Sequence, residues 1–245
     1  MQFRALLLAG LSMTMTCQAR AVVLPATDAS TLAANRPVTA KDAPVTPTGA
    51  DQSSPPQPDF GIFDPPEKVR ENSRQILATG DNHGQPFVII DKIAAKVAVF
   101  DGSGRLRGVS SALLGMAIGD ATAPGIGNKK LRDIPPPQRT TPAGRFEASL
   151  DRNAQGHEIL WIDYEASISL HAVVAGTPTE HRAARLASSS IRDKRISYGC
   201  VNVPGGFFEH IVAPLFRDAD GIVYVLPEMG GAAARLSGVP GRPSR

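Results

Sequence analysis

Short β-type segments separated by turns run through the middle of the chain, and they restrict its fold class more than any other feature. They are rich in Val, Ile, Phe and Tyr, and turn sequences such as "DGSGR" at 101–105 separate them. The clearest of them lie at 87–90, 96–100, 106–109, 159–164 and 168–173. Helical spacing occurs in "GGFFEHIVAPLFRD". Many short strands with a few helices predict a mainly β domain, a β-sandwich or open barrel, over residues 64–228.

The two ends of the chain differ in composition from this domain. Residues 1–21 combine Arg4, a short apolar run and an Ala-Arg-Ala end, which is typical of a secretory signal peptide. The apolar run is too short to span a membrane, so we expect no stable membrane insertion after cleavage. Residues 22–63 are rich in Pro, Thr and Ala and predict a disordered tether, and residues 229–245 predict a flexible tail.

A helix-start signal marks the beginning of the predicted domain. Asp64 is a favourable N-cap residue, Pro65 suits the first helical turn, and Glu67 stands where it would complete a capping box. We therefore expect the domain to open with a helix at this point.

The charge of the chain is mild. Its net charge of +3 suits an anionic polymer or a carboxylate-bearing substrate, or simply a solvated surface. Basic runs interleaved with aromatic residues are missing from the sequence, which argues against nucleic acid as a partner. Clusters of His, Cys and Asp with metal-ligand spacing are also missing, so we predict neither a metal nor another cofactor.

Cys200, in "RISYGCVNVP", is one of two cysteines in the chain. The other, Cys17, lies inside the predicted signal peptide, so Cys200 would remain alone after cleavage. Its thiol then pairs with another chain, lies buried and inert, or carries out chemistry. A thiol is an effective nucleophile only as a thiolate, which requires a base or a cation nearby.

Two of the five histidines are candidates for that base. His171 ends a strand-type run, where a rigid element can aim it at a neighbouring group. His181 follows the capping-box sequence at 177–180, which places it in the first turns of an exposed helix, where the helix dipole disfavours an imidazolium. We favour His171 and keep His181 as the alternative. His83 and His157 lie in polar turns, and His210 lies in a predicted helix.

The neighbours of Cys200 suit acyl chemistry. Gly199 allows the backbone to approach a substrate carbonyl closely, and the amides of Tyr198, Gly199 and Cys200 are candidate donors to an oxyanion. Ser197 and Asn202 are small polar residues that can fix the turn or contact a substrate amide. A tight turn with a half-buried cysteine is the alternative reading of the same residues.

These residues resemble a known family. "SYGCVNV" is similar to the Ser/Thr-His-Gly-Cys signature of the L,D-transpeptidases, the YkuD-type enzymes that cross-link or modify bacterial peptidoglycan. "RTTPAGRFEA" resembles the family's Thr-Pro-x-Gly-x-Phe segment, and "VIIDKIAAKVAVFDGSGRLRGVSSALLG" and "YVLPE" resemble its opening strands and its last strand. The resemblance covers residues 85–228 and implies a YkuD-like fold in a periplasmic enzyme, for which a signal peptide and a tether are suitable.

The resemblance also implies roles for individual residues. Cys200 would be the nucleophile, Gly199 part of the oxyanion turn, and Ser197 a structural hydroxyl. His171 would be the base, with its imidazole oriented by the backbone carbonyl of Ala172. The chain departs from the family in two ways: Tyr198 replaces the motif histidine, and His171 lies further from the cysteine than is usual, a gap that His181 fits better.

The segment 174–196 reads as a helical insertion before the cysteine. It is rich in basic residues that would gate the site or bind the carboxylates of stem peptides, unless they form an ordinary solvated helix face. These residues are Arg182, Arg185, Arg192, Lys194 and Arg195.

The implied reaction is acyl transfer through a thioester, with a peptidoglycan stem peptide as donor and a peptide amine, a wall-attached protein or water as acceptor. An L,D-carboxypeptidase or an amidase on the same scaffold is one alternative. A peptidoglycan-binding module without turnover is another.

Overall fold

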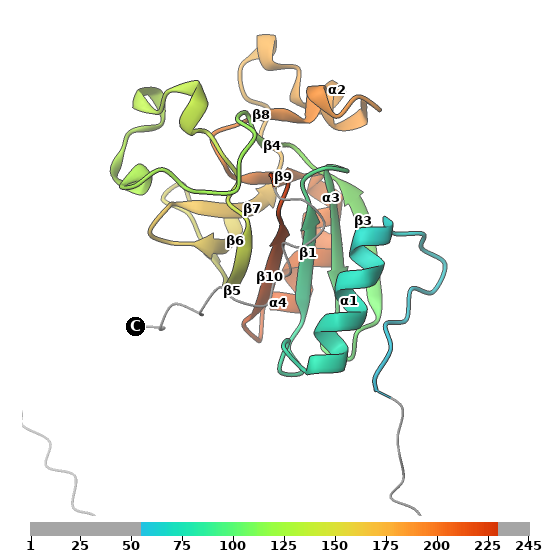
Figure 1. The fold of residues 1–245 in the computed structure, drawn as a ribbon. Helices are drawn as coiled ribbons and strands as arrows, with labels where there is room; N and C mark the ends of the chain where they lie inside the picture. The colour runs from blue at the N-terminus through green and yellow to red at the C-terminus, as the bar shows by residue number, and fades with distance from the viewer. Residues whose placement is uncertain (1–54, 230–245) are drawn as a thin grey trace, which may run out of the picture. The chain divides into compact units, whose positions relative to one another are not determined.

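The computed structural model describes residues 55–229, which form a mainly β domain (Figure 1). The predicted signal peptide, most of the predicted tether and the predicted tail from residue 230 lie outside the described residues. One sheet has eight strands in the order β3-β2-β1-β10-β5-β6-β7-β9, and β4 and β8 form a two-stranded sheet. The predicted class, mainly β with a few helices, is therefore confirmed.

The strands are β1 (Phe87–Asp91), β2 (Lys96–Phe100), β3 (Leu106–Ser111), β4 (Leu114–Gly115), β5 (Gly144–Arg152), β6 (Glu158–Asp163), β7 (Ile168–Ala172), β8 (Arg195–Ser197), β9 (Val201–Val203) and β10 (Gly221–Leu226). The α-helices are α1 (Glu67–Thr79), α2 (Arg182–Ala187), α3 (Gly205–Phe207) and α4 (Ala213–Phe216). A π-helical turn, η6 (Phe208–Val212), joins α3 to α4, and the 3-10 turns are η1 (Ile126–Asn128), η2 (Leu131–Asp133), η3 (Pro136–Gln138), η4 (Pro178–Glu180) and η5 (Arg192–Lys194).

The central strands are buried on both faces. β1 runs parallel to β10 and antiparallel to β2, and all five of its residues are buried. Because side chains alternate along a strand, Phe87 and Ile89 face one hydrophobic cluster and Val88 and Ile90 face another. A run of large apolar residues without alternation is the expected sequence of a strand in such a position.

Helices cover the two faces of the sheet. α1 contributes Val69, Ile76 and Leu77 to the cluster that contains Phe87 and Ile89. The segment from α3 to α4 contributes three residues to the other cluster, namely Phe208, Val212 and Phe216. Figure 1 accordingly shows α1 in front of the strands and the α3–α4 segment behind them.

The start of the domain differs from the prediction. α1 begins at Glu67 with Pro66 as its N-cap, and Asp64 forms an ion pair with Arg70 instead of capping the helix. Two consecutive prolines fix the backbone here, and the Pro66 carbonyl accepts the amides of Val69 and Arg70. The chain also packs before residue 63, where the tether was predicted to end, because Asp59 bridges to Arg105 and the Phe60 ring packs against Phe100.

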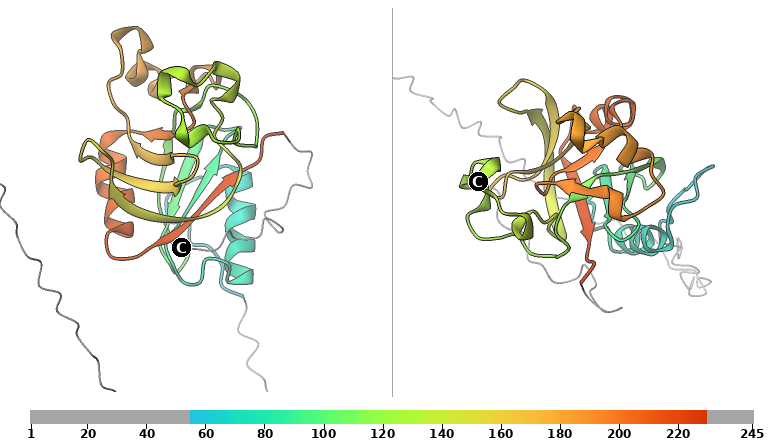
Figure 2. Two further views of the ribbon diagram at one scale, coloured as in Figure 1. Left: turned by 90° about the vertical axis from the view of Figure 1, so that its left-hand side faces the viewer. Right: turned by 90° about the horizontal axis from the view of Figure 1, so that it is seen from above.

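Two long segments project from one end of the sheet. The first runs from β4 to β5 and carries η1 to η3, and the second is the predicted insertion between β7 and β9, which carries α2 (Figures 1 and 2). α2 lies before Cys200 in the chain, as predicted. None of the helices within 55–229 combines the length and the apolar character that crossing a membrane requires.

Candidate active site

The pairing of β7 with β9 brings Cys200 and His171 together. The two strands are parallel, with Leu170 opposite Val201 and His171 opposite Asn202. Cys200 immediately precedes β9 and is therefore level with Ser169. Ser169 and His171 share one face of β7, whereas the alternate side chains of Ile168 and Leu170 pack into the core. Residues that lie far apart in the sequence thus form one side-chain cluster.

The thiol of Cys200 is half-buried and has polar neighbours. Ser169 Oγ donates a hydrogen bond to Sγ at 3.6 Å, and Sγ lies 3.6 Å from the carbonyl oxygen of Ser167. Burial raises the pKa of the Cys200 thiol, but the hydrogen bond and charge of His171, together with Ser169, outweigh burial and hold this pKa below its ordinary value. The thiolate is the form that attacks a carbonyl.

His171 is held in one tautomer. Its Nδ1 donates to the carbonyl oxygen of Ala172 at 2.8 Å, which leaves Nε2 free to accept a proton. Burial and the charge of Arg182 lower the pKa of the imidazole. The hydrogen bond to Cys200, the charge of Cys200 and the hydrogen bond to the Ala172 carbonyl outweigh them and raise this pKa above its ordinary value. The opposite shifts of the two groups favour a thiolate paired with an imidazolium.

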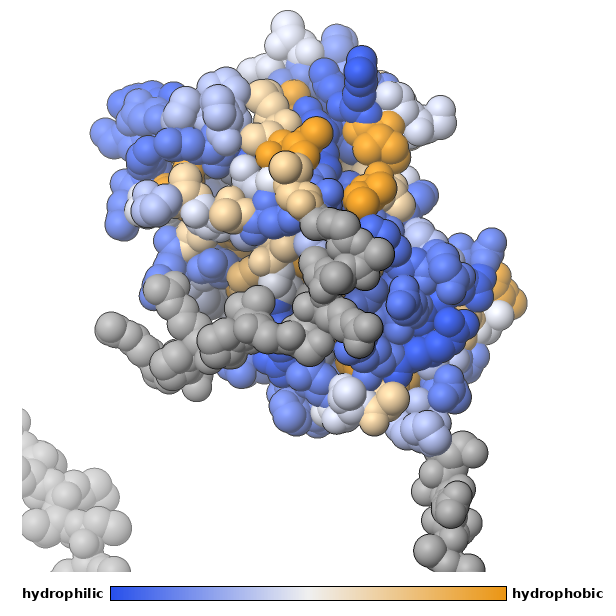
Figure 3. Space-filling view, in the orientation of Figure 1, coloured by the Kyte–Doolittle hydropathy of each residue, from blue (hydrophilic) through white to orange (hydrophobic). Residues whose placement is uncertain are grey.

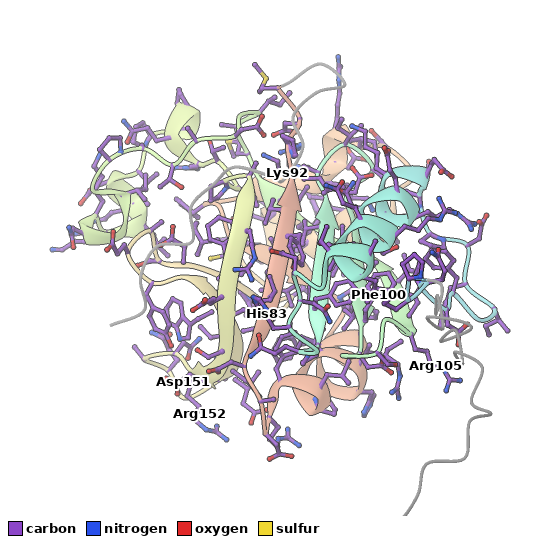
Figure 4. All side chains as sticks on the ribbon, turned by 60° about the horizontal axis from the view of Figure 1, so that its bottom comes forward. His83, Lys92, Phe100, Arg105, Asp151 and Arg152 are labelled. Atoms are coloured by element: carbon purple, nitrogen blue, oxygen red, sulfur yellow. The ribbon has the colours of Figure 1, made fainter. Side chains whose placement is uncertain are left out.

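The other histidines occupy different places. His181 is exposed in the turn between η4 and α2, with a left-handed backbone conformation. His83 lies in the turn before β1, at the opposite end of that strand from Lys92 (Figure 4). His157 lies in the turn between β5 and β6, and His210 lies in η6. Of the five histidines, the one whose side chain interacts with the thiol is His171.

The turn before Cys200 is fixed by hydrogen bonds. Ser197 Oγ donates to the Cys200 carbonyl at 2.6 Å and accepts the amide of Gly199 at 3.1 Å, and Thr141 Oγ1 donates to the Gly199 carbonyl at 2.8 Å. Gly199 has φ +136°, and a Cβ there would lie 2.6 Å from Ile168 Cδ1 and 2.9 Å from the Thr140 carbonyl oxygen. Both the conformation and the lack of space require glycine.

The predicted oxyanion role of Gly199 has to be compared with the hydrogen bond that its amide makes in this turn. Its amide is buried and bonded to Ser197 Oγ, so it does not point outward as an oxyanion donor. Gly199 acts instead by allowing the tight turn. The side chain of Tyr198, predicted near the substrate, packs on the core, and the Arg139 guanidinium lies 4.1 Å from its ring centre. The ring therefore lies between the core and the Arg139 guanidinium.

Asn202 connects the catalytic candidates to the insertion. It is buried, and its backbone exchanges hydrogen bonds with Leu113. Its Nδ2 lies 3.3 Å from His171 Nε2 and 3.4 Å from the Cys200 carbonyl oxygen, and its Oδ1 accepts from Arg182 Nη1 at 2.8 Å. Asn202 is thus a polar contact of the imidazole.

The basic residues of the insertion, for which the sequence left gating, carboxylate binding or a solvated helix face open, are mostly engaged in contacts within the protein. Arg182 pairs with Glu180, Arg185 donates to two backbone carbonyls, and Lys194 Nζ donates to the carbonyls of Arg185 and Leu186. Arg195 pairs with Glu228. Arg192 is exposed. Four of the five basic side chains therefore hold the segment together or join it to the domain.

A groove lies beside the segment that comes directly after β7. It measures about 550 Å³ and starts directly after Ala172. Its lining is mainly apolar and comprises Val173, Val174, Ala175, Thr177, Pro178, His181, Arg182, Ala183 and Ala184. On the face shown in Figure 3, apolar residues gather in the upper part, with hydrophilic residues on both sides. Because the lining residues belong almost entirely to the insertion, the insertion forms a wall beside the candidate site.

Sequence reasoning missed a buried charged cluster around Lys92. The Lys92 ammonium, whose side chain is fully buried, donates to the carbonyls of Gly119 and Thr141 at 2.7 and 2.9 Å and to Asp120 Oδ1 at 2.7 Å. Glu228 Oε1 lies 3.5 Å from it. Figure 4 shows Lys92 at the end of β1. Thr141 also bonds Gly199, so the cluster supports the turn that carries Cys200.

Ser169 and Trp161 were also missed. Ser169 lies two residues before His171 in a strand, a spacing that places both on one face and that could have identified it. Trp161 is opposite Ser169 across β6 and β7, and its ring stacks on Tyr164 with ring centres 4.6 Å apart. Leu160 and Ile162, on either side of Trp161, are buried. Because side chains alternate along a strand, the sequence already indicated that Trp161 points away from the core.

Comparison with known proteins gives matches among solved structures. Protein-family models and curated protein sequences gave no match to the chain. The helical cell shape determining protein Pgp2 from Campylobacter jejuni is 15% identical over 60% of this chain and 49% of its own, with a TM-score of 0.41. An L,D-transpeptidase from Xylanimonas cellulosilytica is 16% identical over 58% of this chain and 60% of its own, with a TM-score of 0.34.

L,D-transpeptidase 1 from Mycobacterium tuberculosis is similar to the chain at 14% identity, over 58% of this chain and 61% of its own, with a TM-score of 0.32. The chain spans about half of the length of Pgp2 and about three-fifths of the length of the two transpeptidases.

Proposed function

We propose that the protein is a cysteine-dependent acyltransferase, an L,D-transpeptidase that acts on peptidoglycan stem peptides. The observation that carries the proposal is the contact between Cys200 and His171, in which each group shifts the pKa of the other toward its charged form. The resemblance of "SYGCVNV" and "RTTPAGRFEA" to the family's motifs indicates the substrate class. The signal-like N-terminus supports a periplasmic location.

Acylation starts from the thiolate. Cys200 Sγ attacks the carbonyl carbon of the third, diamino-acid residue of the donor stem, and the carbonyl π electrons move onto oxygen. The amides of Tyr198 and Cys200 are our candidate donors to this oxyanion, since the Gly199 amide is committed to Ser197. The tetrahedral intermediate collapses to a thioester as the C–N bond breaks, and His171 Nε2 gives its proton to the departing amine of the terminal D-amino acid.

Transfer to the acceptor reverses the proton movement. The acceptor amine attacks the thioester carbonyl, and the now neutral His171 Nε2 takes the proton that the amine loses. The C–S bond then breaks, an amide forms, and the Cys200 thiolate leaves beside an imidazolium. The chain's own residues therefore supply nucleophile, acid and base without a cofactor.

Incubation of the protein lacking residues 1–21 with purified muropeptides tests this proposal. Mass spectra should show cross-linked or exchanged stems with the wild type, and unchanged muropeptides with Cys200→Ala. Trimmed stems alone would mean that water is the acceptor and the enzyme is a carboxypeptidase. In a parallel incubation with cell-wall material that carries attached protein, release of that protein would indicate an amidase. Binding without any product would overturn catalysis.

A further inference from the structure

Arg182 is nearly buried beside the catalytic candidates although it comes from the insertion. Its side chain is 10% exposed, and Nε pairs with Glu180 Oε2 at 2.9 Å. Nη1 reaches Asn202 Oδ1 at 2.8 Å. Gly176 leaves room for this pair, because a Cβ there would lie 2.0 Å from Glu180 Oε2 and 2.8 Å from Arg182 Nε. The position of the guanidinium is thus fixed from several sides.

The guanidinium determines which way the Asn202 amide faces. Arginine only donates hydrogen bonds, so the amide oxygen of Asn202 must point toward Arg182. The amide nitrogen then points toward His171 Nε2, 3.3 Å away. Since Nδ1 of His171 already donates to Ala172, Nε2 can accept from this NH₂ group only when it carries no proton. A rotated amide would instead present oxygen, which accepts from an imidazolium.

Resting on the proposed function, we infer that Arg182 is a positioning residue that locks the Asn202 amide and thereby holds His171 as the unprotonated base needed for transfer to the acceptor. In the free enzyme the Cys200 thiolate works against this and favours an imidazolium. In the thioester that negative charge is gone. Burial, the charge of Arg182 and the NH₂ of Asn202 then favour the neutral imidazole, and they oppose the Ala172 carbonyl and the Glu180 carboxylate, which favour the imidazolium.

The first test measures the titration of His171 in protein whose Cys200 has been alkylated with iodoacetamide, which removes the thiolate as the thioester does. NMR should show a higher His171 pKa in Arg182→Met than in the wild type, and an intermediate one in Arg182→Lys, which keeps the charge. Arg185→Met is the matched control, because Arg185 bonds backbone carbonyls of the insertion and leaves Asn202 alone. An unchanged pKa in Arg182→Met would overturn the inference.

The second test separates the two half-reactions. Arg182→Met should slow transfer to the acceptor about tenfold at neutral pH, the size expected for losing one hydrogen bond to a charged group. Raising the pH should restore it, while the alkylation rate of free Cys200 stays near that of the wild type. Parallel losses in both reactions, or losses matched by Arg185→Met, would mean that Arg182 only stabilises the insertion.

Asn202→Asp is a second variant, and it keeps the Arg182 contact and therefore the fold of the insertion. The carboxylate has the same shape, keeps the contact with Arg182 and accepts from an imidazolium, so the His171 pKa should rise in the alkylated protein. A lower or unchanged pKa would contradict the inference. If the wild type converts no muropeptide, the proposed function fails, but the NMR comparison of Arg182→Met with the wild type and with Arg185→Met still decides the role of Arg182.

Discussion

Individual residues around Cys200 hold their positions through contacts that the local sequence suggests only in part. The signature region predicts a turn with a reactive cysteine, and the motif hydroxyl of Ser197 does fix that turn. The partner of the Gly199 carbonyl, Thr141, lies on another segment and leaves no signal near the cysteine. The direction of the Gly199 amide depends on that packing, so the sequence around Cys200 does not indicate which group this amide bonds.

The identity of the base is tested by comparing two histidines. His171→Ala should slow acylation by at least about a hundredfold, the lower range for loss of a general base. It should also shift the pH profile of Cys200 alkylation upward, because the thiol loses the hydrogen bond and the charge of His171, the two largest contributions that lower its pKa. His181→Ala should keep most of both rates. The reverse pattern would mean that the usual spacing of the family identifies the base better than the strand does.

Gly199 should tolerate no side chain. Gly199→Ala places a Cβ within 3 Å of Ile168 and Thr140 in a left-handed conformation, so we expect a loss of roughly 1–3 kcal/mol in the free energy of unfolding. Cys200 alkylation should fall as well. Gly206→Ala is the control, since its Cβ would meet only His210 Cδ2 at 3.8 Å. Equal stability of the two variants in urea titrations would contradict this account of the turn.

At the scale of elements, the strands were largely predictable and their partners were not. Alternation and β-rich composition located β1, β2, β6 and β7 to within a residue or two, because a half-buried or buried strand needs those residues locally. The insertion was recognised as a segment, but the partners of its charged side chains were not. Glu228, the partner of Arg195, lies far along the chain, and periodicity carries no information about such pairs.

The buried cluster around Lys92 joins elements that are remote in sequence, and its removal should be costly. Lys92→Met leaves Asp120 and Glu228 without their shared ammonium, so the free energy of unfolding should fall by roughly 3 kcal/mol. Arg132→Met removes an exposed pair with Asp133 and should change stability by less than about 0.5 kcal/mol. Urea denaturation measures both. Similar values for the two variants would show that the cluster contributes little.

For the molecule as a whole, a mainly β domain holds Cys200 beside His171, and we propose that this pair carries out acyl transfer. The fold class followed from the strand pattern, and the choice of His171 followed from its place at a strand end. The apolar groove and the Arg182 contact did not follow from the sequence, because they depend on how the insertion folds back over β7 and β9. Only the three-dimensional arrangement brings these residues to the cysteine.

Carbapenem acylation, read by intact-protein mass spectrometry, tests whether Cys200 is the nucleophile. A carbapenem carries a strained amide that an activated thiolate opens, and by its family resemblance the protein should react with it through Cys200. We predict that the mass of the wild type increases by one carbapenem and that Cys200→Ala stays unmodified. Wild-type protein that remains unmodified after long exposure, or an equal adduct on Cys200→Ala, would contradict Cys200 as the nucleophile.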